Sequence, residues 1–359
     1  MTRDLYTWQG GSVGIAVGDG PGLWPSVGEY PFYDRILYYV MTHDHLRNAA
    51  LGHALRAVAP GRRVLDIGTG RDLNWALEAA RSGAKHVDAI EAIEESHAMA
   101  AKVAAASPYA GVIDVVHGTS FDVRPAERAE VCVAELIGSI ASSEGMLAAM
   151  ADARDRLLTP DGVVVPAACD TLVGAVSARE LFPGGPAFSR RALPYLRKIF
   201  DLYGRPFDVR LAVAEPGPEV LLSTAGAVER LRFDGSTPLE ESTRVSLTIE
   251  RDGDVDGLLC WIVLDAGAGA RRLDSLRDKT SWMPVYLPVF DSAVRVRRGD
   301  GLTVEFERRT SDDGVHPDYH VRASLVTAAG VSTGALLSGH HEPGLGTKPI
   351  YQRLFQVIP

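Results

Sequence analysis

Residues 64–70 read VLDIGTG, and this stretch decides the fold that the rest of the chain must follow. The apolar residues around Asp66 predict a buried strand, while Gly68 and Gly70 let the backbone turn tightly and approach a ligand closely. A helix that begins beyond such a turn offers free N–H groups to an anion. Glu91 ends the next apolar run, where a carboxylate can accept both hydroxyls of a ribose. The pattern therefore predicts a nucleotide-type cofactor.

The loop alone leaves two cofactors open, a dinucleotide and S-adenosylmethionine. The third glycine of the dinucleotide pattern GxGxxG is absent, and position 72 is an aspartate. An acid close to a pyrophosphate would repel it, which counts against NAD. Asp72 can equally be read as the N-cap of the following helix.

The neighbouring segments alternate between strand and helix patterns. Helical periodicity covers about 33–58 and ends at Pro60-Gly61, and further helices are expected at 75–82, 95–106 and 145–158. Short β-rich runs at 63–70, 86–91, 113–117, 131–134 and 163–165 separate them. Such alternation predicts an α/β, doubly wound, mostly parallel Rossmann-like sheet.

The pattern of apolar and polar residues changes after Pro166. Segments such as RVSLTIE, GLLCWIVLDA and YHVRASLV alternate between apolar and polar residues without helices between them, which predicts a second, antiparallel β domain. The exception is 189–203, which places Leu193, Leu196, Ile199 and Phe200 on one helical face. Residues 1–28 are glycine-rich and aperiodic, and we interpret them as a flexible or folded-over segment.

Composition narrows the class of protein. The chain has 359 residues, which favours two domains, and a net charge of −9, which disfavours a nucleic-acid partner. No apolar run is long enough for a membrane span, and the N-terminus lacks a signal-peptide pattern. The three isolated cysteines favour a reducing cytoplasm over a disulfide framework. No metal-ligand spacing is found, and the pair His340-His341 is expected at the surface.

Glu135 and Glu144 lie in the segment AELIGSIASSEGML, residues 134–147, after an apolar run. Two carboxylates on one loop beyond a strand can face a single cation, and a planar guanidinium fits two carboxylates best. The alternative is that both are solvated loop residues. Together with the cofactor loop, the pair indicates methylation of a guanidine.

At these residues the chain resembles the protein arginine N-methyltransferase family, from about residue 30 to the C-terminus. The similarity lies in Met41, Asp44 and Arg47 of the first helical region, in VLDIGTG, in the double-glutamate loop, in ARDRLLTPDGVVVP at 153–166, and in TSWMPVYLP at 280–288. The last segment resembles the family's T-H-W loop, with Ser281 in place of the histidine. The family's aromatic signature before Met41 is not clear, since the register of Tyr33, Tyr38 and Tyr39 is uncertain.

The resemblance implies a domain plan and a site. Residues 1–58 would cover the cofactor, 59–166 would form the S-adenosylmethionine-binding Rossmann-like domain, and 167–359 would form a β-barrel substrate domain with a helical dimerisation arm at about 180–205. By resemblance the cofactor site consists of Arg47, Asp66, Gly68, Gly70, Glu91, Ser120 and Phe121. The same comparison assigns Glu135, Glu144, Trp282 and Met41 to the methyl-transfer site, with Glu144 favoured as the proton acceptor.

The expected activity is N-methylation of a guanidino group, most simply on free L-arginine or a related small molecule in a bacterial biosynthetic pathway. Arginine in a peptide or protein is the first alternative. Methylation of an amine or hydroxyl on another natural product is the second, and a catalytically inactive dimerisation scaffold is the third. A cytoplasmic homodimer is the expected assembly.

Overall fold

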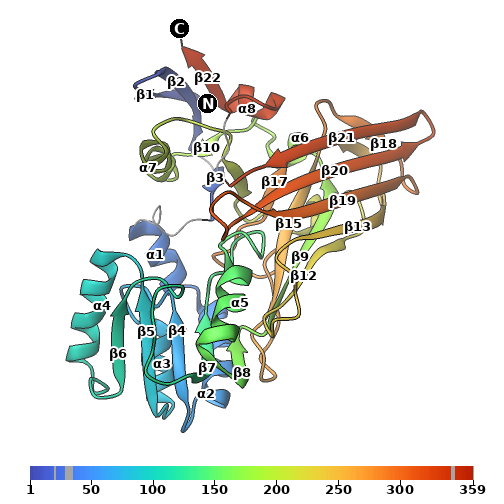
Figure 1. Ribbon diagram of the computed structural model, residues 1–359. Coiled ribbons are helices and arrows are strands. Elements are labelled where there is room, and N and C mark those ends of the chain that lie inside the picture. The colour runs from blue at the N-terminus through green and yellow to red at the C-terminus, as the bar shows by residue number, and fades with distance from the viewer. Residues whose placement is uncertain (20–21, 29–34, 341–343, 359) are drawn as a thin grey trace.

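The computed structural model describes residues 1–19, 22–28, 35–340 and 344–358, and within them a five-stranded parallel sheet forms one domain (Figure 1). The strand order is β6-β5-β4-β7-β8, and every neighbouring pair is parallel. The strands are β4 (Arg63–Ile67), β5 (His86–Glu91), β6 (Ile113–His117), β7 (Ala129–Ala134) and β8 (Leu158–Val165). The helices are α1 (Arg35–Thr42), α2 (His45–Val58), α3 (Asn74–Arg81), α4 (Glu94–Ala106) and α5 (Met146–Arg156). The predicted doubly wound sheet is confirmed.

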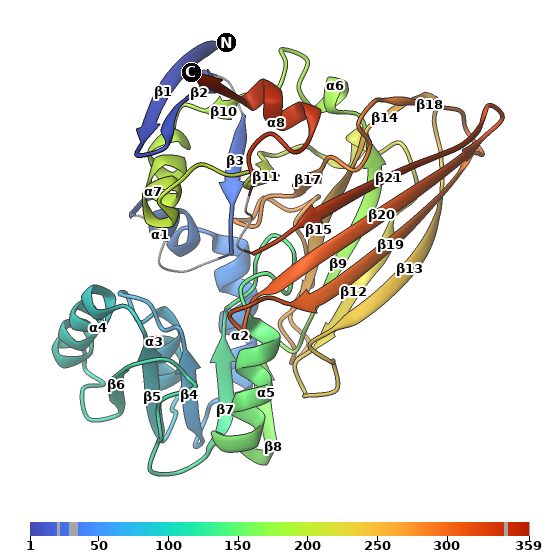
Figure 2. The same ribbon diagram turned by 45° about the horizontal axis from the view of Figure 1, so that its top comes forward.

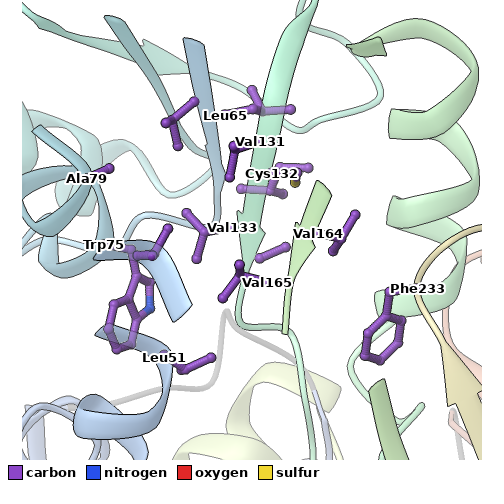
Figure 3. Packing of buried hydrophobic residues seen from close by; sticks show 14 of the residues in the cluster. Leu51, Leu65, Trp75, Ala79, Val131, Cys132, Val133, Val164, Val165 and Phe233 are labelled. Atoms are coloured by element: carbon purple, nitrogen blue, oxygen red, sulfur yellow. The ribbon is translucent and has the colours of Figure 1, made fainter. Parts of the chain in front are cut away.

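The central strands are apolar on both faces because helices cover them on both sides. Val131, Cys132 and Val133 of β7 are fully buried between Trp75 and the residues of β8 (Figure 3). Phe233, from the β domain, packs into the same core near α5. The two domains therefore share one apolar core.

The helix expected over 33–58 is divided in two. Asp44 caps α2, since its side chain accepts the N–H of Arg47 at 2.9 Å, and a cap residue adopts non-helical geometry. Tyr33 lies outside the described residues.

The β domain is built on an eleven-stranded sheet (Figures 1 and 2). Its main path is β1-β2-β10-β3-β11-β17-β15-β9-β12, with β16 and β22 paired to β15 and β2. The strands are β1 (Thr2–Trp8), β2 (Gly11–Gly18), β3 (Leu23–Ser26), β9 (Ala168–Val176), β10 (Phe188–Ser189), β11 (Arg210–Val213), β12 (Gly226–Arg232), β15 (Gly257–Asp265), β16 (Leu273–Asp274), β17 (Val285–Leu287) and β22 (Phe355–Ile358). Residues 1–28 were interpreted as a flexible or folded-over segment. A flexible segment is wrong for β1–β3, because these strands pair within this sheet.

A four-stranded antiparallel sheet, in the order β13-β19-β20-β21, packs against the large sheet through an apolar cluster. Its strands are β13 (Glu241–Thr248), β19 (Gly301–Thr310), β20 (Pro317–Thr327) and β21 (Gly330–Ser338), and β14 (Gly253–Val255) pairs with β18 (Val294–Val296). The predicted antiparallel β-rich second domain is confirmed.

The proposed arm at 180–205 contains α6 (Ala178–Leu181), β10 and α7 (Leu193–Tyr203). The apolar face of α7 is buried within its own chain, since Leu196, Ile199 and Phe200 have no exposed surface. They pack with Val13 and Ile15 of β2 and with α8 (Pro349–Leu354). The segment was predicted to be a dimerisation arm, but these apolar side chains are buried without a second subunit. The sequence pattern could not reveal their partners, which come from both ends of the chain.

No helix in the described part of the chain has both the length and the apolar composition to cross a membrane. The three cysteines are free and buried.

Candidate active site

A cavity of about 360 Å³ lies where β4, β5 and β7 end, beneath α1 and α2. Most of the residues predicted for the cofactor and for methyl transfer line it together: Met41, Arg47, Gly68, Gly70, Glu91, Ser120, Phe121, Glu135 and Glu144. Asp66 and Trp282 do not line it. The parallel sheet explains the convergence, because the carboxyl ends of its strands meet at one edge.

Glu91 is held at the cofactor end by the backbone. Its carboxylate accepts the N–H of Gly70 at 2.9 Å and the N–H of Ile93 at 2.8 Å. Gly68 and Gly70 have φ of 73° and 68°, which side-chain-bearing residues rarely adopt. Burial raises the pKa of the Glu91 carboxyl, and the backbone donors oppose this shift. Glu91 is therefore fixed in position with lone pairs left for a ligand.

Asp66 supports the glycine turn from beneath. It is fully buried and accepts the hydroxyl of Thr69 at 2.6 Å. Burial raises the pKa of Asp66 to about 7, although the Thr69 hydrogen bond opposes the shift. Asp66 was predicted to belong to the cofactor site. It does lie at the glycine turn, but its side chain bonds to the turn and does not line the cavity.

Replacing Asp66 with Asn is expected to flatten the pH dependence of stability between about pH 4 and pH 7. An ordinary aspartate has a pKa of 3.8, so the unfolded chain ionises first. The stability contribution of neutral Asp66 is complete below about pH 4 and is lost as the pH rises through about 7. A gap of about three pKa units corresponds to at most about 4 kcal/mol. Urea unfolding of both proteins without cofactor at pH 5 and pH 8 measures the difference, and parallel pH dependences would contradict the expectation.

Ser120 and Phe121 line the cavity close to Glu91, since they follow β6 and the backbone N–H of Gly118 donates to the carbonyl of Glu91 at 3.0 Å. Arg156 of α5 donates to the carbonyl of Ser120 at 2.7 Å and to that of Phe121 at 3.2 Å. Phe121 is 36% exposed and presents a ring that a flat base can stack on.

Glu135 already binds a guanidinium in this structure, that of Arg47. Both side chains are nearly buried, and the guanidinium carbon of Arg47 lies 5.4 Å from the ring of Trp75 and 5.8 Å from that of Trp282. Arg47 was expected to pair with the cofactor's carboxylate, whereas here it pairs with one of the two glutamates. The contact shows that the position and burial of Glu135 suit a guanidinium.

Trp282 lies behind the double-glutamate loop. Its indole N–H donates to the carbonyl of Ile137 at 2.8 Å, and its ring is only 6% exposed. Trp282 was assigned to the methyl-transfer site, but it does not line the cavity, because its ring packs in the core and its indole N–H is already bonded. Ser281, in the position of the T-H-W histidine, donates its backbone N–H to Asp44 at 2.6 Å.

The double-glutamate loop rests on a buried polar network from the β domain. Glu229 is 1% exposed and accepts the hydroxyl of Ser142 at 2.5 Å, the hydroxyl of Thr171 at 2.6 Å and the guanidinium of Arg308 at 2.9 Å. Thr171 in turn accepts the N–H of Ala141 at 2.9 Å. The loop that carries both glutamates is therefore fixed just before Glu144.

The sequence analysis missed a wall of the cavity formed by Asp313, Val315 and His316. These residues follow β19, far along the chain from Glu144, and their segment has the composition of an ordinary turn. The expectation of a surface position for His340 is wrong, since it is 2% exposed and its ring stacks on that of His316. His341 lies outside the described residues.

The lining fits S-adenosylmethionine better than a dinucleotide. Asp72 lines the cavity beside Gly70, where it would repel a pyrophosphate. The reading of Asp72 as an N-cap is not supported, because the cap residue of α3 is Leu73. Glu91 is placed for a ribose and Phe121 for a base, and Arg47 lines the same cavity.

The parallel sheet, the glycine turn, Glu91 and the paired glutamates, followed by a β domain, define a Rossmann-like methyltransferase. No family model matches the chain. Over 277 residues, 74% of this chain and 74% of its relative, the chain is 31% identical to the arginine N(omega)-methyltransferase of Streptomyces achromogenes subsp. streptozoticus. The chain belongs to the arginine N-methyltransferase family.

Other relatives agree with this assignment. Probable histone-arginine methyltransferase 1.3 of Arabidopsis thaliana is 28% identical over 264 residues, 68% of this chain and 48% of that protein, so the chain spans about half of its length. Two solved structures share the fold. Arabidopsis thaliana protein arginine methyltransferase 10 has a TM-score of 0.69 at 18% identity, covering 86% of this chain and 98% of its own. The Trypanosoma brucei PRMT1 enzyme-prozyme heterotetrameric complex with AdoHcy has a TM-score of 0.69 at 17% identity, covering 85% and 98%.

Proposed function

We propose that the protein methylates the guanidino group of a small molecule, free L-arginine or a close relative, with S-adenosylmethionine as the methyl donor. The observation that carries the proposal is that Glu135 and Glu144 line one cavity with Glu91 and the glycine turn. The relative of Streptomyces achromogenes, which is named for arginine rather than for a protein, favours a small substrate.

S-adenosylmethionine, when bound, supplies an electrophilic methyl group on a sulfonium. Glu91 would accept the ribose hydroxyls, and Ser120 and Phe121 would flank the base. Glu135 and Glu144 would hold the substrate guanidinium and draw its positive charge away from the attacking nitrogen, and this positioning contributes several kcal/mol. Met41 would crowd the transfer site and limit how the substrate turns. Arg47 would exchange Glu135 for the anionic end of the cofactor.

Incubation with S-adenosylmethionine and either free L-arginine or an arginine-rich peptide tests the proposal, with products read by mass spectrometry. Mass gain on free arginine is expected. Mass gain on the peptide alone would favour the protein arginine alternative, and methylation of neither guanidine would overturn the guanidine proposal. A natural-product amine or hydroxyl acceptor would then be tested next.

We also propose a homodimer in the cytoplasm. With most of α7 buried in its own chain, the support that remains is exposed Leu202 on α7 and exposed Leu5 on β1. Light scattering at micromolar concentration is expected to give twice the mass of one chain, and a monomer would contradict it.

A further inference from the structure

The wall of the cavity beside Glu144 comes from the loop between β19 and β20. Asp313, Val315 and His316 of this loop line the same cavity as Glu144. The loop also packs directly against Gly145, since a Cβ atom there would lie 2.6 Å from Cγ1 of Val315 and 3.8 Å from Cδ2 of His316. An imidazole therefore lies next to the glutamate that faces the substrate.

Asp313 holds this imidazole in one orientation. One carboxylate oxygen accepts the N–H groups of Val315 at 2.8 Å and His316 at 2.9 Å, and the other accepts Nδ1 of His316 at 2.5 Å. Burial opposes ionisation of Asp313, but these hydrogen bonds hold the pKa of its carboxyl below the ordinary value. The ring of His316 stacks on that of His340, with centroids 4.1 Å apart and planes within 5°.

The hydrogen bond to Asp313 selects a tautomer. When Nδ1 carries the hydrogen, Nε2 of His316 has the lone pair and can accept a proton. A carboxylate that fixes an imidazole in this way is the general arrangement of a base in proton transfer.

The three groups do not form a metal site of good geometry. Asp313, His316 and His340 offer ligand atoms within 4.8 Å of one another, as a metal cluster would. A histidine nitrogen binds a metal in the plane of its ring, and two stacked parallel rings have no common point in both planes near their nitrogens. Proton transfer is therefore the better use of the cluster.

Methylation of a guanidinium must release one proton. The nitrogen forms a bond to the methyl carbon, the bond between that carbon and the sulfonium sulfur breaks with its electron pair left on sulfur, and an N–H proton leaves so that the product keeps one positive charge. A carboxylate can take this proton first, and an imidazole is the stronger base, with an ordinary pKa of about 6.5 against about 4.3 for glutamate.

We propose that His316, positioned by Asp313, takes the reaction's proton from Glu144 and passes it to solvent. This inference rests on the proposed guanidine methylation. The charged and titratable groups around His316 among the described residues are Asp313 on its own loop, His340 after β21, Glu144 before α5, and Arg308 of β19, which shares a second small cavity with it. Arg308 is neutralised by Glu229.

The proposal is tested by steady-state kinetics between pH 5.5 and pH 9, with the guanidino substrate that the wild-type enzyme methylates. His316→Asn retains a donor for Asp313 but removes the proton-accepting Nε2. It is expected to lower kcat by at least about 10-fold, which is less than for a direct general base because water can replace it partly. KM is expected to stay unchanged. The acid limb of the kcat profile should disappear in His316→Asn, and Asp313→Asn should also lower kcat because its amide no longer fixes the tautomer of His316.

The matched control is His320→Asn, a change of the same kind on β20 outside the cavity, which should leave the kcat profile as in the wild type. Calorimetric binding of S-adenosylhomocysteine checks that each variant is folded. If His316→Asn does not fold, the kinetics of Asp313→Asn decide between the two outcomes. An unchanged kcat and acid limb in His316→Asn, or a raised KM with unchanged kcat, would overturn the proton role. A wild type that methylates no guanidine would overturn the proposed function itself.

Discussion

Replacing Glu144 with Gln is expected to lower methyl transfer to a guanidinium by at least about 10²-fold, the low end for charge-positioning and proton-accepting groups. The amide keeps the size of the side chain and removes the charge that faces the substrate. Glu135→Gln is expected to have a loss of similar size. Cofactor affinity should barely change in Glu144→Gln, because Glu91 and the glycine turn, rather than Glu144, would hold the cofactor.

The Glu135 variant should also lose stability. Glu135→Gln removes the charge that pairs with the nearly buried guanidinium of Arg47, so it should lower stability more than an ordinary surface change. Glu91→Ala is the complementary control, since it should weaken S-adenosylhomocysteine binding while the guanidine end stays formed. Calorimetry and single-turnover assays separate these effects. Near-normal turnover in both Gln variants would mean that neither glutamate positions the substrate, and the guanidine proposal would fall with them.

Replacing Glu229 with Ala is expected to destabilise the protein by about 3–5 kcal/mol, because it removes one partner of a buried ion pair. Arg308 is 2% exposed and would retain only the carbonyls of Pro238 and Leu239 and a longer contact of 3.5 Å to Glu241. Because Glu229 also holds Ser142, methyl transfer should fall as well. Urea unfolding with parallel kinetics measures both effects.

Two further changes separate stability from positioning. Glu229→Gln keeps the shape of the side chain and removes its charge. It replaces the Ala variant in these measurements if the Ala variant does not fold. Ser142→Ala removes the hydrogen bonds of Ser142 to Glu229 and to Tyr319 and leaves the pair of Glu229 and Arg308 intact. Glu307→Gln, a change at a half-buried position on β19 whose partner Arg309 is exposed, should alter stability by less than about 0.5 kcal/mol. A Glu229→Ala variant as stable and active as Glu307→Gln would show that the network is not needed.

The sequence predicted the parallel-sheet domain well because its signals are local. Strand β5 and strand β6 begin and end at the predicted residues, since each short β-rich run is bounded by residues that favour turns. The glycine turn, Glu91 and the paired glutamates were recognisable because each motif occupies one short segment.

Features that depend on distant pairing could not be predicted in this way. Strand β2 looks aperiodic, yet it pairs with β1 and with β22, which is supplied by the far end of the chain. The partners of Arg47 and Trp282 depend on how α2 and the 280–288 loop meet the double-glutamate loop. His316 reaches the cavity only because the small sheet places the β19–β20 loop against Gly145.

The pairing of β2 with β22 also makes the β domain discontinuous in sequence. The chain enters the large sheet at β1–β3, leaves it to build the parallel-sheet domain, and returns at β9 (Figures 1 and 2). Folding slows as the sequence separation of native contacts grows, so the parallel-sheet domain should fold first and the large sheet should close late. Pulsed hydrogen exchange during refolding would show this order as earlier protection of β4 and β5 than of β2. The cofactor pocket would then exist before the glutamate loop has its support, and catalytic competence would be the last property that the folding chain acquires.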